Sequence, residues 1–151
     1  MGIKMEIVDI KEREDLIEQY VNLRNSYTEL LLTSPVTITA TKEWLKKAYI
    51  ETRGLIEDSI LAGVVILYLS KGGEIAFFAK DKNKGTGSKL LNIIEEVAKE
   101  EKLKSIWGWV LEDNFIAQGV FEKNGFEKIE ICVKEYKGIV RQGVKYEKFL
   151  K

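Results

Sequence analysis

The spacing of apolar and polar residues predicts helices and strands that alternate along the whole chain. Apolar residues recur three and four positions apart over 15–31 and again over 87–101, which is the period of a helix with one buried face. Short apolar or alternating runs between glycine and polar residues predict strands. Such runs cover 4–10, 53–57, 60–69, 75–79 and 105–111, and two further alternating strands close the chain.

Local signals set several helix boundaries. A loop containing Pro35 is expected over 33–41, and Thr41 is expected to cap the short helix that follows. A helix over 114–123 ends at Asn124-Gly125, a pair typical of a left-handed C-cap. The resulting order is βααβββαβαββ. It predicts an α/β chain with a mixed sheet, because the central meander is antiparallel and the strand–helix–strand unit after it is parallel.

Composition narrows the functional classes. The chain has 151 residues and is expected to form one domain over 1–151. Its 24 basic and 24 acidic residues leave no basic excess, which argues against nucleic acid as the main partner. There is no histidine and only one cysteine, Cys132, so we expect no metal site and no internal disulfide. The lack of a possible internal disulfide predicts a reducing, cytoplasmic location. The longest apolar run, 60–69, is too short to span a membrane, and no membrane association is expected.

The segment 77–89 carries the clearest chemical signal. A predicted strand leads into a turn with Gly85 and Gly87 and then directly into a helix, with lysines at Lys82, Lys84 and Lys89. The first turn of a helix has unpaired N–H groups and the positive end of the dipole, and glycine lets an anion approach them. The pattern therefore predicts a phosphate site, although a plain glycine turn with solvated lysines would have the same sequence. The spacing fits neither a P-loop nor a dinucleotide-binding fingerprint.

Two motifs together resemble the GNAT acetyltransferases. The segment 82–87 is similar to that family's pyrophosphate loop, Arg/Gln-x-x-Gly-x-Gly/Ala, with Lys82 in place of Arg or Gln. About thirty residues on, 114–126 is similar to the family's second signature, in which an asparagine, an alanine and an aromatic residue precede Glu-Lys-x-Gly-Phe. The order of elements agrees as well, so the resemblance extends along the whole chain.

The resemblance implies a GNAT acyl-CoA acyltransferase fold, with a splayed mixed sheet flanked by helices, and acetyl-CoA as cosubstrate. In such folds the pantetheine arm pairs with the fourth strand and the pyrophosphate sits on the amides that open the following helix. Asn114 would lie near the cofactor arm and Phe121 near the sulfur. The implied cofactor-binding residues are Phe77, Phe78, Ala79, Lys82, Asn83, Lys84, Gly85, Thr86, Gly87, Ser88, Lys89, Asn114 and Phe121.

The resemblance also implies direct attack of an amine on the thioester, with a main-chain N–H at Phe77 or a neighbour stabilising the oxyanion. The tyrosine that often protonates the departing thiolate is missing, because its position is Phe121. Tyr136, Tyr68 and Tyr146 are candidate substitutes, although a strand tyrosine whose ring packs in the core would have the same sequence. Without histidine the general base is expected to be a carboxylate, a tyrosine or a water chain. Glu112 and Glu74 are the candidates, although solvated charges at strand ends would have the same sequence.

The sequence therefore predicts an N-acetyltransferase that moves an acetyl group from acetyl-CoA to a primary amine of a small molecule or peptide. Two alternatives stay open: a GNAT-fold module that binds acetyl-CoA without turnover, and an unrelated α/β protein that binds a nucleotide at the Gly85 loop. The acceptor is not named by any motif. A homodimer would be in keeping with similar domains, and no residue pattern decides it.

Overall fold

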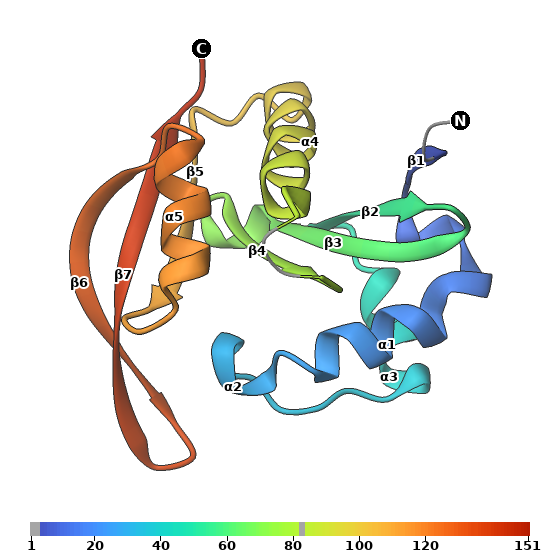
Figure 1. Ribbon diagram of the computed structural model, residues 1–151, viewed down its shortest axis with the longest axis horizontal. Coiled ribbons are helices and arrows are strands. Elements are labelled where there is room, and N and C mark those ends of the chain that lie inside the picture. Colours follow the sequence, from blue (N-terminus) through green and yellow to red (C-terminus); the bar gives the residue numbers. More distant parts are fainter. Residues whose placement is uncertain (1–3, 82–83) are drawn as a thin grey trace.

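A seven-stranded mixed sheet with helices on both faces forms the computed structural model, which describes residues 4–81 and 84–151 (Figure 1). The spatial order of strands is β1-β2-β3-β4-β5-β7-β6. The strands are β1 (Met5–Val8), β2 (Ile50–Glu57), β3 (Ile60–Tyr68), β4 (Glu74–Ala79), β5 (Ser105–Leu111), β6 (Glu127–Tyr136) and β7 (Ile139–Phe149). The helices are α1 (Ile17–Asn25), α2 (Thr28–Leu31), α3 (Ile38–Leu45), α4 (Thr86–Glu100) and α5 (Phe115–Lys123), with short 3₁₀ turns η1 (Ile10–Glu12), η2 (Glu14–Leu16) and η3 (Leu69–Lys71). The predicted α/β fold with a mixed sheet is confirmed.

The sheet is buried on both faces, which explains the long apolar run of β3. Its side chains alternate between two hydrophobic clusters: Val65 and Leu67 belong to the one with α4 and α5, whereas Val64 and Ile66 belong to the one with α1 and α3. A strand covered on both faces is apolar at successive positions. None of the helices in the described ranges combines the length and apolar character that a membrane crossing requires.

The sheet splays between β4 and β5. Strands β3 and β4 pair without interruption, whereas the parallel ladder between β4 and β5 consists of the single pair Glu74–Trp107. Beyond this pair the two strands separate toward the carboxyl end of β4. The splayed sheet that the resemblance implied is therefore present, and it leaves a gap in the middle of the molecule.

The helical segment expected over 15–31 is divided in the structure. α1 ends at Asn25, and α2 is a single turn that begins at Thr28. The Ser26 hydroxyl donates to the Leu23 carbonyl at 2.6 Å, a bond that competes with the helical ladder. The Asn25 amide exchanges hydrogen bonds of 2.8 and 2.9 Å with the backbone of Val36, which holds the returning loop against the end of α1.

Two boundary predictions were also wrong. Thr41 lies inside α3, and the N-cap is Thr37, whose hydroxyl accepts from the Ala40 amide at 3.1 Å. Both threonines can cap, and the extended backbone at Thr37 decides between them. Strand β2 begins at Ile50 rather than at residue 53, because its pairing with β3 continues as far as Ile50–Tyr68.

Candidate active site

The first turn of α4 is arranged to receive an anion. Gly85 is the N-cap in a left-handed conformation, with φ of 77°, and no side chain caps the helix. The first helical hydrogen bond runs from the Lys89 amide to the Gly85 carbonyl, so the three amides between them have no acceptor within the helix. A Cβ built on Gly85 would meet no atom within 4 Å, which leaves the amides open. Of the predicted loop residues, Lys84 and Lys89 are exposed, and Lys82 and Asn83 lie outside the described residues.

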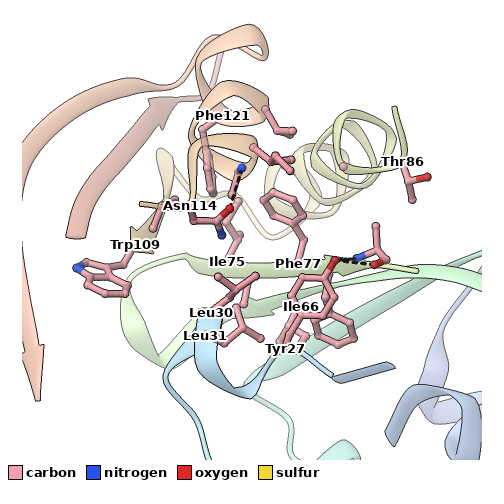
Figure 2. Close-up of a pocket in the computed structure, with 18 of the residues that line it drawn as sticks. Tyr27, Leu30, Leu31, Ile66, Ile75, Phe77, Thr86, Trp109, Asn114 and Phe121 are labelled. Carbon is pink, nitrogen blue, oxygen red and sulfur yellow. Dashed lines mark hydrogen bonds between the residues drawn. The ribbon is translucent and has the colours of Figure 1, made fainter. Parts of the chain in front are cut away.

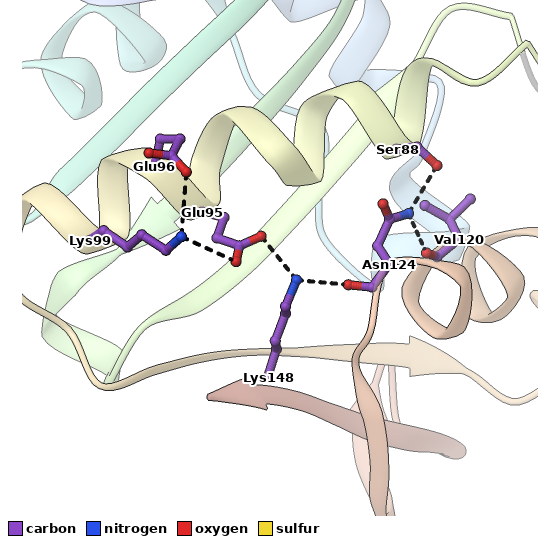
Figure 3. Close-up of polar contacts among 7 residues, drawn as sticks. All are labelled: Ser88, Glu95, Glu96, Lys99, Val120, Asn124 and Lys148. Carbon is purple, nitrogen blue, oxygen red and sulfur yellow. Dashed lines mark hydrogen bonds and ion pairs between the residues drawn. The ribbon is translucent and has the colours of Figure 1, made fainter. Parts of the chain in front are cut away.

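A polar network fixes the start of α4 to the end of α5 (Figure 3). The Asn124 side-chain amide donates to the Ser88 hydroxyl at 2.9 Å and to the Val120 carbonyl at 2.7 Å. The Lys148 ammonium donates to the Asn124 carbonyl at 2.9 Å and to Glu95, near the middle of α4, at 3.0 Å. The predicted C-cap at Asn124-Gly125 is thus also the point that holds the anion site in register with α5.

The edge of β4 toward the gap offers main-chain groups. The Lys80 amide donates to the Ala62 carbonyl on β3 at 2.8 Å. Because hydrogen-bonded pairs alternate along an antiparallel ladder, the backbone groups of Ile75, Phe77 and Ala79 point away from β3 and into the gap. An extended ligand arm lying in the gap could pair with the groups of Phe77 as an added strand, since Ile75 adjoins the pair with β5 and Tyr27 engages Ala79.

The three strand residues predicted to hold the pantetheine arm differ in what they present. The side chain of Phe77 faces α5, and its backbone faces the gap. The backbone of Phe78 pairs with β3, and its ring is completely buried against α1. The backbone of Ala79 is engaged by Tyr27, whose hydroxyl donates to the carbonyl at 2.6 Å and accepts from the amide at 3.4 Å.

A cavity of about 590 Å³ lies at the gap and is lined by residues from both faces of the sheet (Figure 2). We call its two parts the α4 half and the α2 half, after the helix on each side. The α4 half is lined by residues that include Phe77, Gly85, Thr86, Gly87, Ser88, Asn114, Ala117, Val120 and Phe121. The α2 half is lined by residues that include Arg24, Tyr27, Leu30, Leu31, Thr33, Ile66, Tyr68, Lys71, Glu74, Trp109 and Lys134.

The wall of the α4 half is a cluster of aromatic rings around Phe121. This ring is 3% exposed, stacks on Tyr146 at 5.4 Å between centroids, and meets Phe77 and Phe126 edge-on at 5.4 and 4.9 Å. It lies against Gly108, where a Cβ would come within 2.6 Å of the ring. The ring therefore supplies shape and an apolar surface, and it brings no hydroxyl to the site.

Two predicted residues support this wall, Asn114 at the start of α5 and Tyr146 on β7. The Asn114 side-chain oxygen accepts from the Ala117 amide at 3.3 Å, so Asn114 is the N-cap of α5 and lines the cavity at the same time. The Tyr146 hydroxyl donates to the Glu122 carboxylate at 2.8 Å behind Phe121. Burial, followed by this hydrogen bond, raises the pKa of Tyr146 to about 12. Tyr146 is not among the described residues that line the cavity.

The α2 half carries charge. The Glu74 carboxylate lies 3.9 Å from the Lys71 ammonium and 3.9 Å from the Lys134 ammonium. Lys134 also lies over the Trp109 ring, 4.7 Å from its centroid. Trp109 donates its indole N–H to the Cys132 carbonyl at 3.2 Å, and the residue lines the cavity. The half therefore presents a carboxylate, several cations and one broad apolar ring.

The three predicted catalytic residues lie in different places. Glu74 lines the α2 half, whereas Glu112 and Tyr136 are outside the set of described residues that line the cavity. Glu112 is exposed at the end of β5, and the Tyr136 hydroxyl donates to the Thr33 carbonyl at 3.0 Å. Tyr68, the remaining candidate acid, lines the α2 half. Burial raises its pKa, and the Arg24 guanidinium offsets part of that rise.

Sequence reasoning missed Arg24, Tyr27, Lys71 and Lys134 as residues of the site. They come from α1, the segment after it, the turn before β4, and β6, and no local motif joins them. In the described part of the chain, no three side chains of histidine, cysteine, aspartate or glutamate lie close enough to hold a metal ion.

Comparison with known proteins identifies the family. Residues 17–126 match the model of the acetyltransferase (GNAT) family. No curated protein matches the chain.

Among solved structures, the fold is similar to that of yncA from Salmonella typhimurium, described with its cofactor acetyl-CoA (TM-score 0.85, 11% identity, 100% of this chain and 95% of that one). It is also similar to spermidine N-acetyltransferase from Vibrio cholerae in complex with CoA and spermine (0.82, 17%, 96% and 95%). A third similar structure is an acetyl transferase from Salmonella typhimurium that modifies the N-terminal serine of the 50S ribosomal subunit protein L7/L12 (0.78, 13%, 97% and 95%).

These findings confirm the expected fold and the expected cosubstrate class, acetyl-CoA. They also remove the alternative of an unrelated nucleotide-binding α/β protein. The chain belongs to the GNAT family of acetyltransferases.

Proposed function

We propose that this protein is an N-acetyltransferase that moves the acetyl group of acetyl-CoA directly to a primary amine of a small molecule or peptide. The observation that carries the proposal is the single cavity that joins the open amides of α4 to a chamber containing Glu74 on the other face of the sheet. Because the cavity is lined from both faces of the sheet, it could hold a cofactor on one side of the gap and an amine on the other. The similar proteins described with spermine and with a ribosomal protein N-terminus agree with an amine acceptor.

The residues of the α4 half fit CoA. The amides of Thr86, Gly87 and Ser88 would hold the pyrophosphate, with Lys84 and Lys89 adding positive charge. The main-chain groups of Phe77 would pair with the pantetheine arm. When bound there, acetyl-CoA supplies an activated thioester.

The chemistry then requires proton transfer at the amine. The amine nitrogen forms a bond to the acetyl carbon, and the carbon–sulfur bond breaks with its electron pair remaining on sulfur. Starting from the ammonium, one proton ends on the CoA thiol and one is released to solvent. Glu74 lines the α2 half. We assign its carboxylate to hold the ammonium group and to take its proton, directly or through water. The neutral phenol of Tyr68 is a candidate donor on the same side.

A calorimetric titration tests the cofactor assignment. We expect the purified chain to bind acetyl-CoA with micromolar affinity and ATP much more weakly. Replacing Gly85 and Gly87 with valine should abolish this binding, because a β-branched residue is strained at φ of 77° and a side chain at 87 would press on Phe77 and Val120. Gly138→Val is the matched control: its φ is 76° and its surroundings are also open, but it lies in the β6–β7 turn. A preference for ATP, or unchanged acetyl-CoA binding in the double variant, would contradict the assignment.

An inactive acetyl-CoA-binding module is the alternative, favoured by the phenylalanine at 121 in place of the usual tyrosine. Acetylation of any amine at a rate above the uncatalysed one would exclude it. The expected cytoplasmic location stays a prediction, and it fits the use of acetyl-CoA.

A homodimer is a further part of the proposal. Apolar side chains on the β6–β7 hairpin are largely exposed, among them Ile131 at 63%, Val133 at 62% and Val140 at 63%. A surface of this kind favours association. Light scattering after gel filtration would measure the mass in solution, and a monomer at micromolar concentration would contradict a dimer.

A further inference from the structure

The charges of the α2 half are out of balance for a simple amine. The described residues that line it include three cations, Arg24, Lys71 and Lys134, and the carboxylate of Glu74. The other two charged residues that line the cavity, Asp81 after β4 and Lys123 at the end of α5, carry opposite charges and leave the positive excess unchanged. A chamber for a polyamine would be expected to carry an excess of carboxylates, because like charges at short range repel. This chamber has the opposite excess.

Arg24 stands apart from the other two cations. Lys71 and Lys134 both pair with Glu74, whereas no carboxylate within the described ranges lies at ion-pair distance from Arg24. Its Nη1 donates to the Ser34 carbonyl at 3.2 Å, which uses one of the five N–H groups of a guanidinium. The side chain is half-buried at the end of α1 and lies close enough to Tyr68 for its charge to lower that phenol's pKa. A half-buried guanidinium is well suited to bind a carboxylate.

The remaining walls are apolar. Leu30 and Leu31 of α2, Ile66 of β3 and Trp109 of β5 line the same chamber (Figure 2). The whole cavity has a volume of about 590 Å³ and must also hold the pantetheine arm, so the part of the acceptor that enters it has to be small.

We propose that the acceptor is a free amino acid with an apolar or aromatic side chain, an inference that rests on the proposed function. The carboxylate of the amino acid binds Arg24, its ammonium group faces Glu74, and its side chain packs between α2 and Trp109. In this arrangement the negative carboxylate of the amino acid complements the excess of positive charge, and its positive ammonium group complements Glu74. A polyamine would leave Arg24 unpaired and place further ammonium groups beside Lys71 and Lys134.

Matched pairs of amines test the proposal by steady-state release of free CoA. The pairs are L-phenylalanine with 2-phenylethylamine and L-methionine with 3-(methylthio)propylamine, and spermidine is a third kind of acceptor. We expect each amino acid to exceed its decarboxylated partner in kcat/KM by about tenfold or more, as a charge-assisted hydrogen bond predicts. Equal or better turnover of the decarboxylated amines, or of spermidine, would overturn the proposal.

A substitution tests whether Arg24 causes the preference for the amino acid over its decarboxylated partner. Arg24→Met should raise KM for the amino acid and bring the ratio of kcat/KM values within each pair close to one. Arg13→Met is the matched control, since Arg13 lies in the turns before α1 and pairs with Asp15. If Arg24→Met does not fold, L-phenylalanine methyl ester replaces it, because removal of the carboxylate charge should have the same effect on the wild-type chain. An unchanged ratio in both measurements would contradict the role of Arg24.

The outcome also separates this inference from the proposed function. Acetyl-CoA binding with turnover of simple amines but not of amino acids would leave the proposed function standing and overturn the inference. If acetyl-CoA binds but no amine is acetylated, calorimetry in the presence of CoA decides. Tighter binding of L-phenylalanine than of 2-phenylethylamine would support the inference, and the absence of such a preference would overturn it.

Discussion

On the side of the sheet covered by α4 and α5, the cavity is built from main-chain amides, glycines and aromatic rings, whereas on the side of α2 it is built from charged side chains. The α4 half offers Gly85, the open amides after it and the Phe121 ring. The α2 half offers Arg24 and the Glu74 carboxylate between two lysines. The first arrangement suits a ligand part with a constant shape and charge, such as the CoA pyrophosphate and arm. The second can be changed one residue at a time, which suits the choice of an acceptor.

If the two halves have these separate tasks, a change in one should leave the other's ligand unaffected. Glu74→Gln gives the largest expected effect. We expect kcat/KM for the amine to fall by about 100-fold or more, because general base catalysis is worth 10²–10⁴-fold, while the Kd of acetyl-CoA measured by calorimetry stays within about twofold. Glu112→Gln discriminates between the two candidates, since Glu112 lies outside the cavity lining. A larger loss in Glu112→Gln than in Glu74→Gln would show that the α2 half is not where the proton is taken.

Gly108→Ala should disturb the α4 half, whereas Glu74→Gln changes the α2 half. The added methyl group would come within 2.6 Å of the Phe121 ring and force it to move. Overpacking of this kind costs about 1–3 kcal/mol of unfolding free energy. We also expect weaker acetyl-CoA binding, because the ring forms the wall of that half. Urea unfolding and calorimetry measure the two effects, and normal stability with normal acetyl-CoA affinity would argue against the ring's role.

Tyr146→Phe tests the support behind Phe121. Loss of the hydrogen bond to Glu122 should lower the free energy of unfolding at pH 7 by about 1 kcal/mol. The folded-state pKa of about 12 lies above the usual value near 10, so above pH 10 the unfolded chain loses this proton first and stability falls as pH rises. The variant lacks this contribution, so its deficit relative to the wild type should shrink between pH 10 and pH 11. Chemical unfolding at pH 7, 10 and 11 measures it, and a constant deficit would contradict the raised pKa.

Gly119→Ala should give the smallest change, and it should be a gain. Gly119 is in the middle of α5, and a Cβ built there meets no atom within 4 Å. Replacing a helical glycine by alanine in open space raises the free energy of unfolding by about 0.5–1 kcal/mol. Thermal unfolding checks the direction. A loss of stability would mean that the surface of α5 at the cavity is more crowded than its geometry indicates.

The sequence by itself determined the parts of this protein that depend on neighbouring residues. The strand–turn–helix at Gly85 is local, because helix geometry and glycine's freedom at positive φ create the open amides wherever that pattern occurs. The alternation of β3 between two cores and the cap at Gly125 follow from local patterns as well. The family resemblance rested on these same segments, which is why the fold and the α4 half were foreseen.

Only the tertiary structure decided the α2 half. Arg24, Glu74 and Lys134 lie on α1, β4 and β6, and they meet because the sheet order and the splay at Glu74–Trp107 bring those elements to one chamber. The choice of Thr37 over Thr41 as a cap, and the break between α1 and α2, likewise depended on contacts with distant backbone such as Val36. Side chains far apart in sequence carry no spacing signal, so the charge balance of this chamber is fixed by packing alone.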